Sequence, residues 1–146
     1  PSIMSKTREQ ISQEADTLAK IAVDCAFRLH TETGPGLLES VYEVVLAKMI
    51  TDQGVSVERQ SHIPIQLMGV SFTEGFRADL LLNKTLLIEL KSVENLQALH
   101  SKQTLTYLRL LDLPLGLLIN FGAPTFKQGI RRIANDFRHS PPSLQQ

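Results

Sequence analysis

Three residues in the middle of the chain have the types and spacing that phosphate chemistry requires. Asp79 precedes Glu89 by ten residues, and Lys91 stands two residues after Glu89. On adjacent strands, two carboxylates whose Cβ atoms lie roughly 5 Å apart repel each other unless a cation lies between them. Oxygen ligands favour Mg²⁺ or Mn²⁺, and a nearby lysine can orient or deprotonate water and stabilise negative charge. These groups are the minimum for hydrolysing a phosphodiester bond.

The loop between the two strands decides whether Asp79 and Glu89 can meet. Strand residues two apart point to one face, so Glu89 and Lys91 share a face. A two-residue loop at 83–84 would direct Asp79 to the other face, whereas a three-residue loop at 83–85 places it opposite Glu89. We predict the three-residue loop or a bulge. The alternative is that Glu-x-Lys is only a pair of charged groups at a strand end, which is the commoner meaning of so short a motif.

The hydrophobic periods predict the elements that position these residues. A helical period follows the capping-box sequence at 7–10, and Gly34 and Gly54 end two successive helices. A period of two then marks the strands. The predicted elements are a helix that follows the capping box at 7–10 and is broken at 33–36, a helix at 37–53, strands at 55–67, 71–82 and 86–93, a helix at about 96–111 capped by Asn95, a strand at 115–121, and a last helix at about 126–137 that carries Lys127, Arg131 and Arg132.

This order, α-α-β-β-β-α-β-α, predicts an α/β fold with a mixed central sheet of about four strands, because a helical crossover links the third strand to the fourth. Leucines occupy both parities of the central strands. Helices are therefore expected on both faces of the sheet. We predict a single domain over 1–146 with short flexible termini at about 1–6 and 139–146.

Composition restricts the partners and the compartment. Fifteen basic residues balance fifteen acidic ones, so no overall positive field attracts nucleic acid, and any such binding must be local. The single cysteine, Cys25, cannot form an internal disulfide, which favours a reducing cytoplasm. The chain has no stretch of 18 apolar residues and no apolar signal segment at its start, so no contact with a membrane is expected.

Several short segments around these residues resemble the PD-(D/E)XK nuclease superfamily. Asp79, then Glu89-Leu90-Lys91 on a hairpin followed by a helix and a strand, has the order of the superfamily signature. Residues 36–42 match the motif that names the GxxExxY proteins within it. The resemblance covers about Ile21 to Ile133 and implies a restriction-endonuclease-like core. The matching segments are 36–42, 74–79, 88–91, 103–108 and 116–121.

The resemblance implies a role for each matching residue. The implied metal ligands are Asp79, Glu89, the Leu90 carbonyl and Glu39, with Glu39 binding directly or through water, and the implied catalytic lysine is Lys91. The superfamily often has proline immediately before the aspartate that corresponds to Asp79. This chain has Ala78 there, and the residue at that position varies within the superfamily. The helix that follows would lie beside the site, with His100, Gln103 and Tyr107 on one face. These three residues and Arg77 are expected to support or bind substrate.

Simpler readings of some of these residues stay open. Glu39 and Glu43 could form the solvated face of an amphipathic helix. Gln103 and Tyr107 could be the polar edge of a core helix, because tyrosine commonly buries its ring and leaves its hydroxyl in water.

Two classes of function follow. The first is a nuclease dependent on Mg²⁺ or Mn²⁺ that hydrolyses DNA, with RNA as the other substrate; cutting both strands would call for a homodimer, and a protein partner could supply the missing positive charge. The second is a non-catalytic module that binds nucleic acid or protein and retains the fold. A further enzyme reading, hydrolysis of a small phosphate ester, predicts a closed pocket beside the metal.

Overall fold

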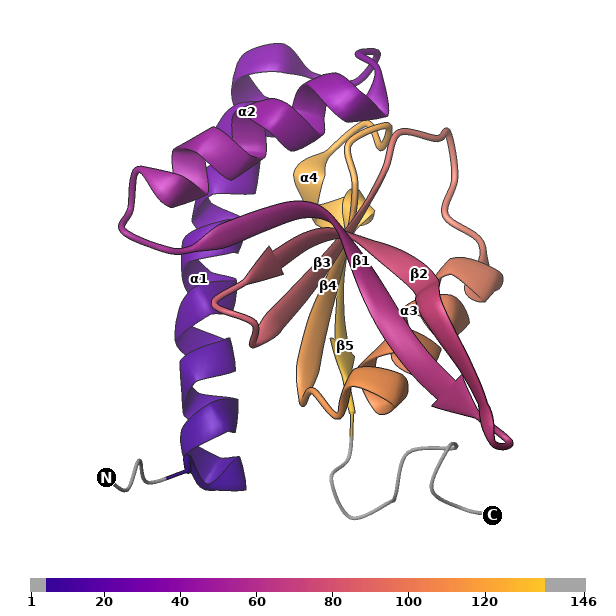
Figure 1. Cartoon of the computed structure of the whole chain (residues 1–146). Helices are drawn as coiled ribbons and strands as arrows, with labels where there is room; N and C mark the ends of the chain where they lie inside the picture. The colour runs from indigo at the N-terminus through magenta and orange to yellow at the C-terminus, as the bar shows by residue number, and fades with distance from the viewer. Residues whose placement is uncertain (1–4, 136–146) are drawn as a thin grey trace.

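The computed structural model describes residues 5–135 (Figure 1). The predicted flexible termini lie outside these residues, except for Ser5 and Lys6. Within this range, four helices and five strands follow one another. They are α1 (Arg8–Thr33), α2 (Glu39–Thr51), β1 (Val57–Leu67), β2 (Val70–Leu82), β3 (Leu86–Lys91), α3 (Ala98–Leu111), β4 (Leu115–Asn120), α4 (Phe126–Gly129) and β5 (Ile130–Ala134).

The first helix begins where the capping box predicts. The Thr7 hydroxyl accepts a hydrogen bond from the Gln10 N–H at 3.0 Å, and the Gln10 side-chain oxygen accepts one from the Thr7 N–H at 2.9 Å. These two bonds satisfy backbone donors that a helix N-terminus otherwise leaves without partners. α1 ends at Gly34, whose φ of 66° is costly for residues with a Cβ atom. The helix therefore starts and stops at features visible in the sequence.

The five strands form one mixed sheet in the order β1-β2-β3-β4-β5. β3 and β4 run parallel, with α3 connecting them as the crossover, and the other three described pairs are antiparallel. In the β2–β3 hairpin Leu80 lies opposite Ile88 and Leu82 lies opposite Leu86, which leaves three residues, 83–85, in the turn. The predicted register is confirmed. The side chains of Asp79, Glu89 and Lys91 consequently belong to one face of the sheet.

The predicted last helix at 126–137 is wrong over the described residues; positions 136 and 137 lie outside them. α4 ends after one turn at Gly129, and the chain continues as β5, which pairs antiparallel with β4. A Cβ atom on Gly129 would lie 2.2 Å from the Asn120 carbonyl oxygen, so glycine permits the close approach that brings β5 alongside β4. All six residues of β4 are buried, and their backbone groups need hydrogen-bond partners on both sides. The sheet therefore has five strands where about four were predicted, and Arg131 and Arg132 lie on an edge strand.

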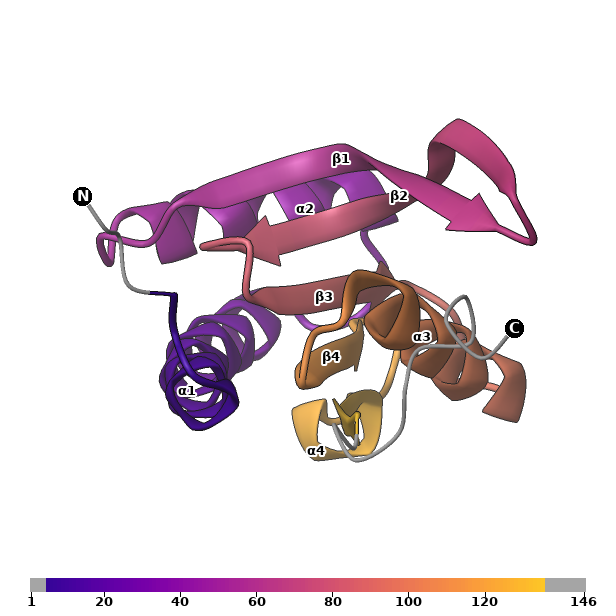
Figure 2. The ribbon, with the colours of Figure 1, turned by 60° about the horizontal axis from the view of Figure 1, so that its bottom comes forward.

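Helices cover both faces of the sheet, as predicted. Leu80, Leu82 and Ile88 belong to a large core with α1 and α2, whereas Leu81 and Leu87 belong to a smaller core with Leu108 of α3. In both views β3 and β4 lie between α1 and α3 (Figures 1 and 2). Within the described residues, no helix is long and apolar enough to cross a membrane. The result is an α/β fold consistent with the restriction-endonuclease-like architecture.

Candidate active site

The sheet is interrupted on both sides of Asp79. The β2–β3 pairing stops at Leu80 and Ile88, one residue short of Asp79 and Glu89. In its place, the Asp79 N–H donates to the Glu89 carboxylate at 2.9 Å, and the Leu90 N–H donates to the Asp79 carboxylate at 2.8 Å. Side chains thus replace the backbone hydrogen bonds between the strands at this point. The two carboxylates are held side by side in a partly buried position.

The strand on the other side of Asp79 is distorted as well. Gln60 of β1 would face Asp79, but the β1–β2 pairing passes from Arg59 to Ser61 without it, and Gln60 has a φ of 50°. Its side-chain amide donates to Asp79 Oδ1 at 3.2 Å and also to Glu43 of α2. A helix on one face of the sheet is thereby linked to the interrupted strand.

Glu43 was not predicted as a site residue; the solvated face of an amphipathic helix, shared with Glu39, was one alternative for it. Its side chain is buried, with 4% of the residue exposed, and Arg59 contacts its carboxylate at 3.1 Å. The only sequence signal is its spacing of four from Glu39, which puts both acidic side chains on one helix face. A burial of this kind depends on contacts with β1 that the helical period cannot reveal.

Glu39 is placed by the segment that precedes α2. Gly36 has a φ of 117°, a backbone conformation available mainly to glycine. The ring of Tyr42 is buried and stacks on Phe121 with centroids 4.3 Å apart. Its hydroxyl donates to the Gly34 carbonyl at 2.6 Å and accepts from the Leu37 N–H at 3.2 Å. These contacts fix the start of α2, and Glu39 is its exposed first residue.

Lys91 ends β3, and its neighbours tie that strand end to two other segments. The Ser92 hydroxyl donates to the Leu37 carbonyl at 2.8 Å, which joins the end of β3 to the start of α2. The buried side chain of Asn120 exchanges two hydrogen bonds of 2.9 Å with the backbone of Val93. Glu39 and Lys91 therefore belong to segments that are directly connected.

The electrostatics of the site reflect four charged groups in a confined space. Burial raises the pKa of Glu89 to about 8, and the negative charge of Asp79 acts in the same direction. Burial also raises the pKa of Asp79, and partial desolvation followed by the charge of Asp79 raises the pKa of Glu39. The positive charge of Lys91 opposes all three shifts. Protonated carboxyl groups are thus favoured, and a cation placed among them would favour ionisation instead.

Tyr107 lies close to this cluster on α3. Its ring stacks on Phe76 with centroids 4.0 Å apart, and its hydroxyl accepts a hydrogen bond of 2.8 Å from the Gln103 amide. Burial raises the pKa of Tyr107, and so do the negative charges of Glu89 and Asp79. α3 thus places Tyr107 close enough to interact electrostatically with Glu89 and Asp79, and Gln103 is bonded to Tyr107.

The other two supporting candidates are not drawn into the cluster by any contact. α3 begins at Ala98, and its N-cap residue is Gln97 and not the predicted Asn95. The His100 side chain accepts a hydrogen bond of 3.1 Å from the Gln97 N–H and so completes the capping box. Arg77 lies exposed on β2 opposite His62. Its side chain forms no hydrogen bond or ion pair with the other residues that the structure describes. His100 has a structural role, and Arg77 remains available to a ligand.

The donor set suits a hard cation that retains most of its water. In residues 5–135 no three His, Cys, Asp or Glu side chains form a ready metal-binding group. Asp79 and Glu89 nevertheless offer two adjacent carboxylates whose charges oppose each other. Mg²⁺ commonly binds proteins through one or two carboxylates and keeps several water molecules. The residues therefore fit such an ion as a two-carboxylate site, and Glu39 lies near enough to interact electrostatically with Asp79.

Comparison with known proteins places the chain in a family. The family model described as the PD-(D/E)XK nuclease superfamily matches residues 16–133, which is most of the chain. The chain belongs to the PD-(D/E)XK nuclease superfamily. No curated protein and no solved structure matches it. Nuclease activity and divalent metals are general in the superfamily, and the matched range runs from the middle of α1 into β5.

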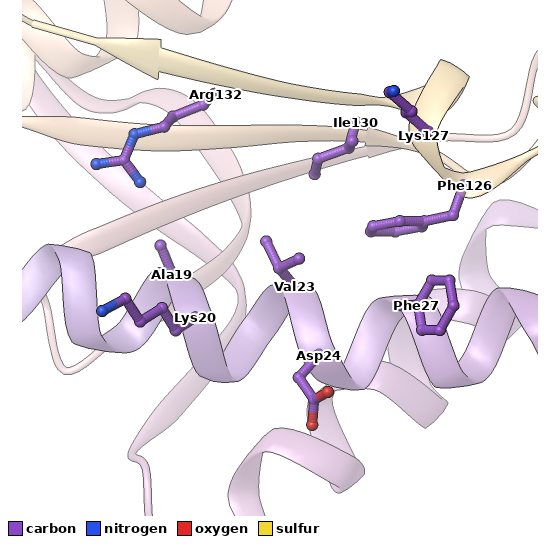
Figure 3. Close-up of a pocket in the computed structure, with 9 residues that line it drawn as sticks. All are labelled: Ala19, Lys20, Val23, Asp24, Phe27, Phe126, Lys127, Ile130 and Arg132. Atoms are coloured by element: carbon purple, nitrogen blue, oxygen red, sulfur yellow. The ribbon is translucent and has the colours of Figure 1, made fainter.

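A separate groove in this PD-(D/E)XK domain lacks the chemistry of a nuclease site. It lies between α1 and the segment from α4 to β5, where Phe27 and Phe126 meet edge to face at 5.8 Å (Figure 3). Val23 and Ile130 continue its apolar wall, and Asp24 is the one acidic residue among those described in its lining. The groove shares no residue with the carboxylate cluster, so the two are distinct features.

Proposed function

We propose that this chain is a divalent-metal-dependent nuclease that hydrolyses phosphodiester bonds in DNA, with RNA as the other candidate substrate. The observation that carries the proposal is the pair Asp79 and Glu89. Each carboxylate accepts a backbone hydrogen bond from the strand that carries the other, next to the point where the β2–β3 pairing ends, and Lys91 lies two residues after Glu89. Membership of the PD-(D/E)XK nuclease superfamily supports the same reaction.

In this proposal Asp79 and Glu89 hold Mg²⁺ or Mn²⁺, and Glu39 and the Leu90 carbonyl complete its surroundings. When bound, the ion would polarise a phosphoryl oxygen, neutralise developing charge and acidify water. Hydrolysis consumes one water molecule: a P–O bond to water forms, the P–O bond to the leaving oxygen breaks, and that oxygen takes up a proton. The chain's own contribution is to hold these groups in fixed positions, since Asp79 and Glu89 accept backbone hydrogen bonds.

Lys91 and Tyr107 are the groups that would act on substrate. The ammonium group of Lys91 would orient the attacking water and stabilise the negative charge that develops on the phosphoryl oxygens. Tyr107, with Gln103 bonded to its hydroxyl, would contact the nucleic-acid backbone from the α3 side. Arg77, exposed on the strand that carries Asp79, would add a contact to phosphate.

One observation favours the second function, a non-catalytic module that binds nucleic acid or protein. In the described part of the chain, Glu39, Asp79 and Glu89 do not form a three-ligand metal group. A module that retains the fold without catalysis would need no such group. The two functions differ in whether a divalent ion binds at the pair and whether phosphodiester bonds are cut.

We further propose membership of the GxxExxY group, on the basis of Gly36, Glu39 and Tyr42 and the contacts that fix them. Cys25 is a buried free cysteine, which suits a reducing cytoplasm. Cleavage of both strands of a duplex would require two copies of the site, so a homodimer is expected for that substrate. A protein partner would supply the phosphate contacts that a chain of zero net charge lacks.

The decisive experiment is a cleavage assay with labelled single-stranded, duplex and branched DNA and with RNA, in the presence of Mg²⁺ or Mn²⁺. Wild-type protein is expected to cut at least one of these substrates only when metal is present. Asp79→Ala and Lys91→Ala are expected to lower the rate by at least about 10³-fold, because the first removes a metal ligand and the second a group that stabilises the transition state.

Two exposed residues of α1 provide matched controls. Asp24→Ala and Lys20→Ala remove the same chemical groups away from the cluster and should retain the wild-type rate. Absence of cutting by wild type on every substrate, with metal binding demonstrated, would favour the binding module. Equal activity in Asp79→Ala and wild type would exclude the site itself.

A further inference from the structure

Gln60 joins the site to a buried carboxylate that the proposed reaction does not use. Its amide nitrogen lies within hydrogen-bonding distance of Asp79 Oδ1, at 3.2 Å, and also donates to Glu43 Oε1. An amide nitrogen has two hydrogens, so one residue can donate to both carboxylates at once. We propose that Gln60 is a positioning residue of the metal site, which orients Asp79 through an anchor on Glu43. This inference rests on the proposed function and deepens it.

The hydrogen bonds of Asp79 explain why this contact would matter. Oδ2 accepts from the Leu90 N–H at 2.8 Å, and Oδ1 accepts from Gln60. With each oxygen held by a different strand, the plane of the carboxylate is fixed, and lone pairs remain on both oxygens for a cation. Without Gln60, the carboxylate would keep a single hydrogen bond and could rotate. Ligands oriented in this way bind metal more tightly than free ones.

Glu43 serves as the anchor because it is itself held in place. It is buried, and Arg59 contacts its carboxylate through two nitrogens, at 3.1 and 3.2 Å. A carboxylate fixed by a guanidinium group has little rotational freedom. The line of contacts from Arg59 through Glu43 and Gln60 to Asp79 therefore joins β1, α2 and β2 at the interrupted point of the sheet.

The backbone of Gln60 gives independent support. Its φ of 50° lies in the left-handed region, which residues with a Cβ atom occupy at a cost in free energy. The two neighbouring pairs, Arg59 with Leu80 and Ser61 with Ala78, keep the same register. No residue is inserted, so the distortion is local to Gln60. Strained conformations of this kind concentrate at functional sites.

A glycine substitution separates the side chain from the backbone. Gln60→Gly removes the amide and suits the left-handed conformation, whereas Gln60→Ala removes the amide and keeps the strain. The measurements are Mn²⁺ affinity by calorimetry, with the metal alone as the probe, and the midpoint of thermal unfolding. Both variants are expected to bind Mn²⁺ about 10- to 100-fold more weakly than wild type. Gln60→Gly should unfold at a higher temperature than Gln60→Ala.

Gln66→Gly is the matched control, because Gln66 lies on the same strand, is exposed and pairs regularly with Ser71. It should lower the unfolding temperature and leave Mn²⁺ affinity unchanged. Wild-type affinity in Gln60→Gly would overturn the inference and leave the proposed nuclease intact. Weakened binding in Gln60→Gly, with no cleavage by wild type, would support the inference and count against the nuclease. Failure of wild type to bind Mn²⁺ would overturn both.

Discussion

The raised pKa of Glu89 makes the stability of the metal-free protein depend on pH in a way that one substitution should remove. In the unfolded chain this carboxyl group has its ordinary pKa of 4.5, and in the folded protein burial and the charge of Asp79 raise that pKa to about 8. Between these values the folded state holds a proton that the unfolded state has lost. The free energy of unfolding therefore falls as pH rises through this window, and the loss is complete above pH 8.

The size of the effect follows from the shift. Each pH unit inside the window costs about 1.4 kcal/mol, so two units, from pH 5.5 to 7.5, cost about 2.7 kcal/mol. At about 3 °C per kcal/mol for a domain of this size, the unfolding midpoint should fall by about 8 °C because of Glu89 alone. Glu89→Gln keeps a side-chain oxygen that can accept from the Asp79 N–H but never ionises. Between pH 5.5 and 7.5, the unfolding midpoint of this variant should therefore fall by about 8 °C less than that of wild type.

The assay is thermal unfolding of metal-free protein, followed by circular dichroism at several values between pH 5 and 8.5. Glu32→Gln, on the exposed surface of α1, controls for the loss of one carboxylate. The difference between Glu89→Gln and wild type should widen steadily with pH. Parallel curves would refute the reasoning, because they would mean that the Glu89 carboxyl group is not penalised by its surroundings.

Three further substitutions test how the site is positioned. Tyr42→Phe removes two hydrogen bonds to the segment before α2 and should lower the free energy of unfolding, measured by chemical denaturation, by about 1–2 kcal/mol. The cleavage rate should fall by a larger fraction, because Glu39 loses its fixed position. Ser92→Ala, which frees the Leu37 carbonyl, should cost about 1 kcal/mol or less and lower cleavage without abolishing it. Leu87→Ala, in the core under α3, should cost about 2–5 kcal/mol; a smaller change would show that α3 is loosely packed there.

The register of the β2–β3 hairpin shows what the sequence could supply. The three-residue turn followed from requiring Asp79, Glu89 and Lys91 on one face, and the structure has that turn. Alternation along the strands also predicted both cores, because leucines at both parities need cover on both faces. Local periodicity determined these features, and local periodicity is visible in one sequence.

The errors arose where distant contacts decide. The residues at 130–134 are compatible both with a continuation of α4 and with a strand. The strand forms because β4, already paired with β3 on one side, needs hydrogen-bond partners on its other side. Glu43 has the spacing of a surface residue and becomes buried against Arg59 and Gln60 of β1. The left-handed backbone of Gln60 has no signature, since glutamine rarely adopts it.

Binding of Mn²⁺ by calorimetry, repeated at pH 7 in buffers of different ionisation enthalpy, tests the central claim that Asp79 and Glu89 together hold one divalent cation. The account predicts one ion per chain. It also predicts that binding releases protons, chiefly from Glu89, because a group with a pKa of about 8 is mostly protonated at that pH. Binding should be lost in both Asp79→Ala and Glu89→Gln. Wild-type affinity in either variant, or an absence of binding to wild type, would contradict the claim.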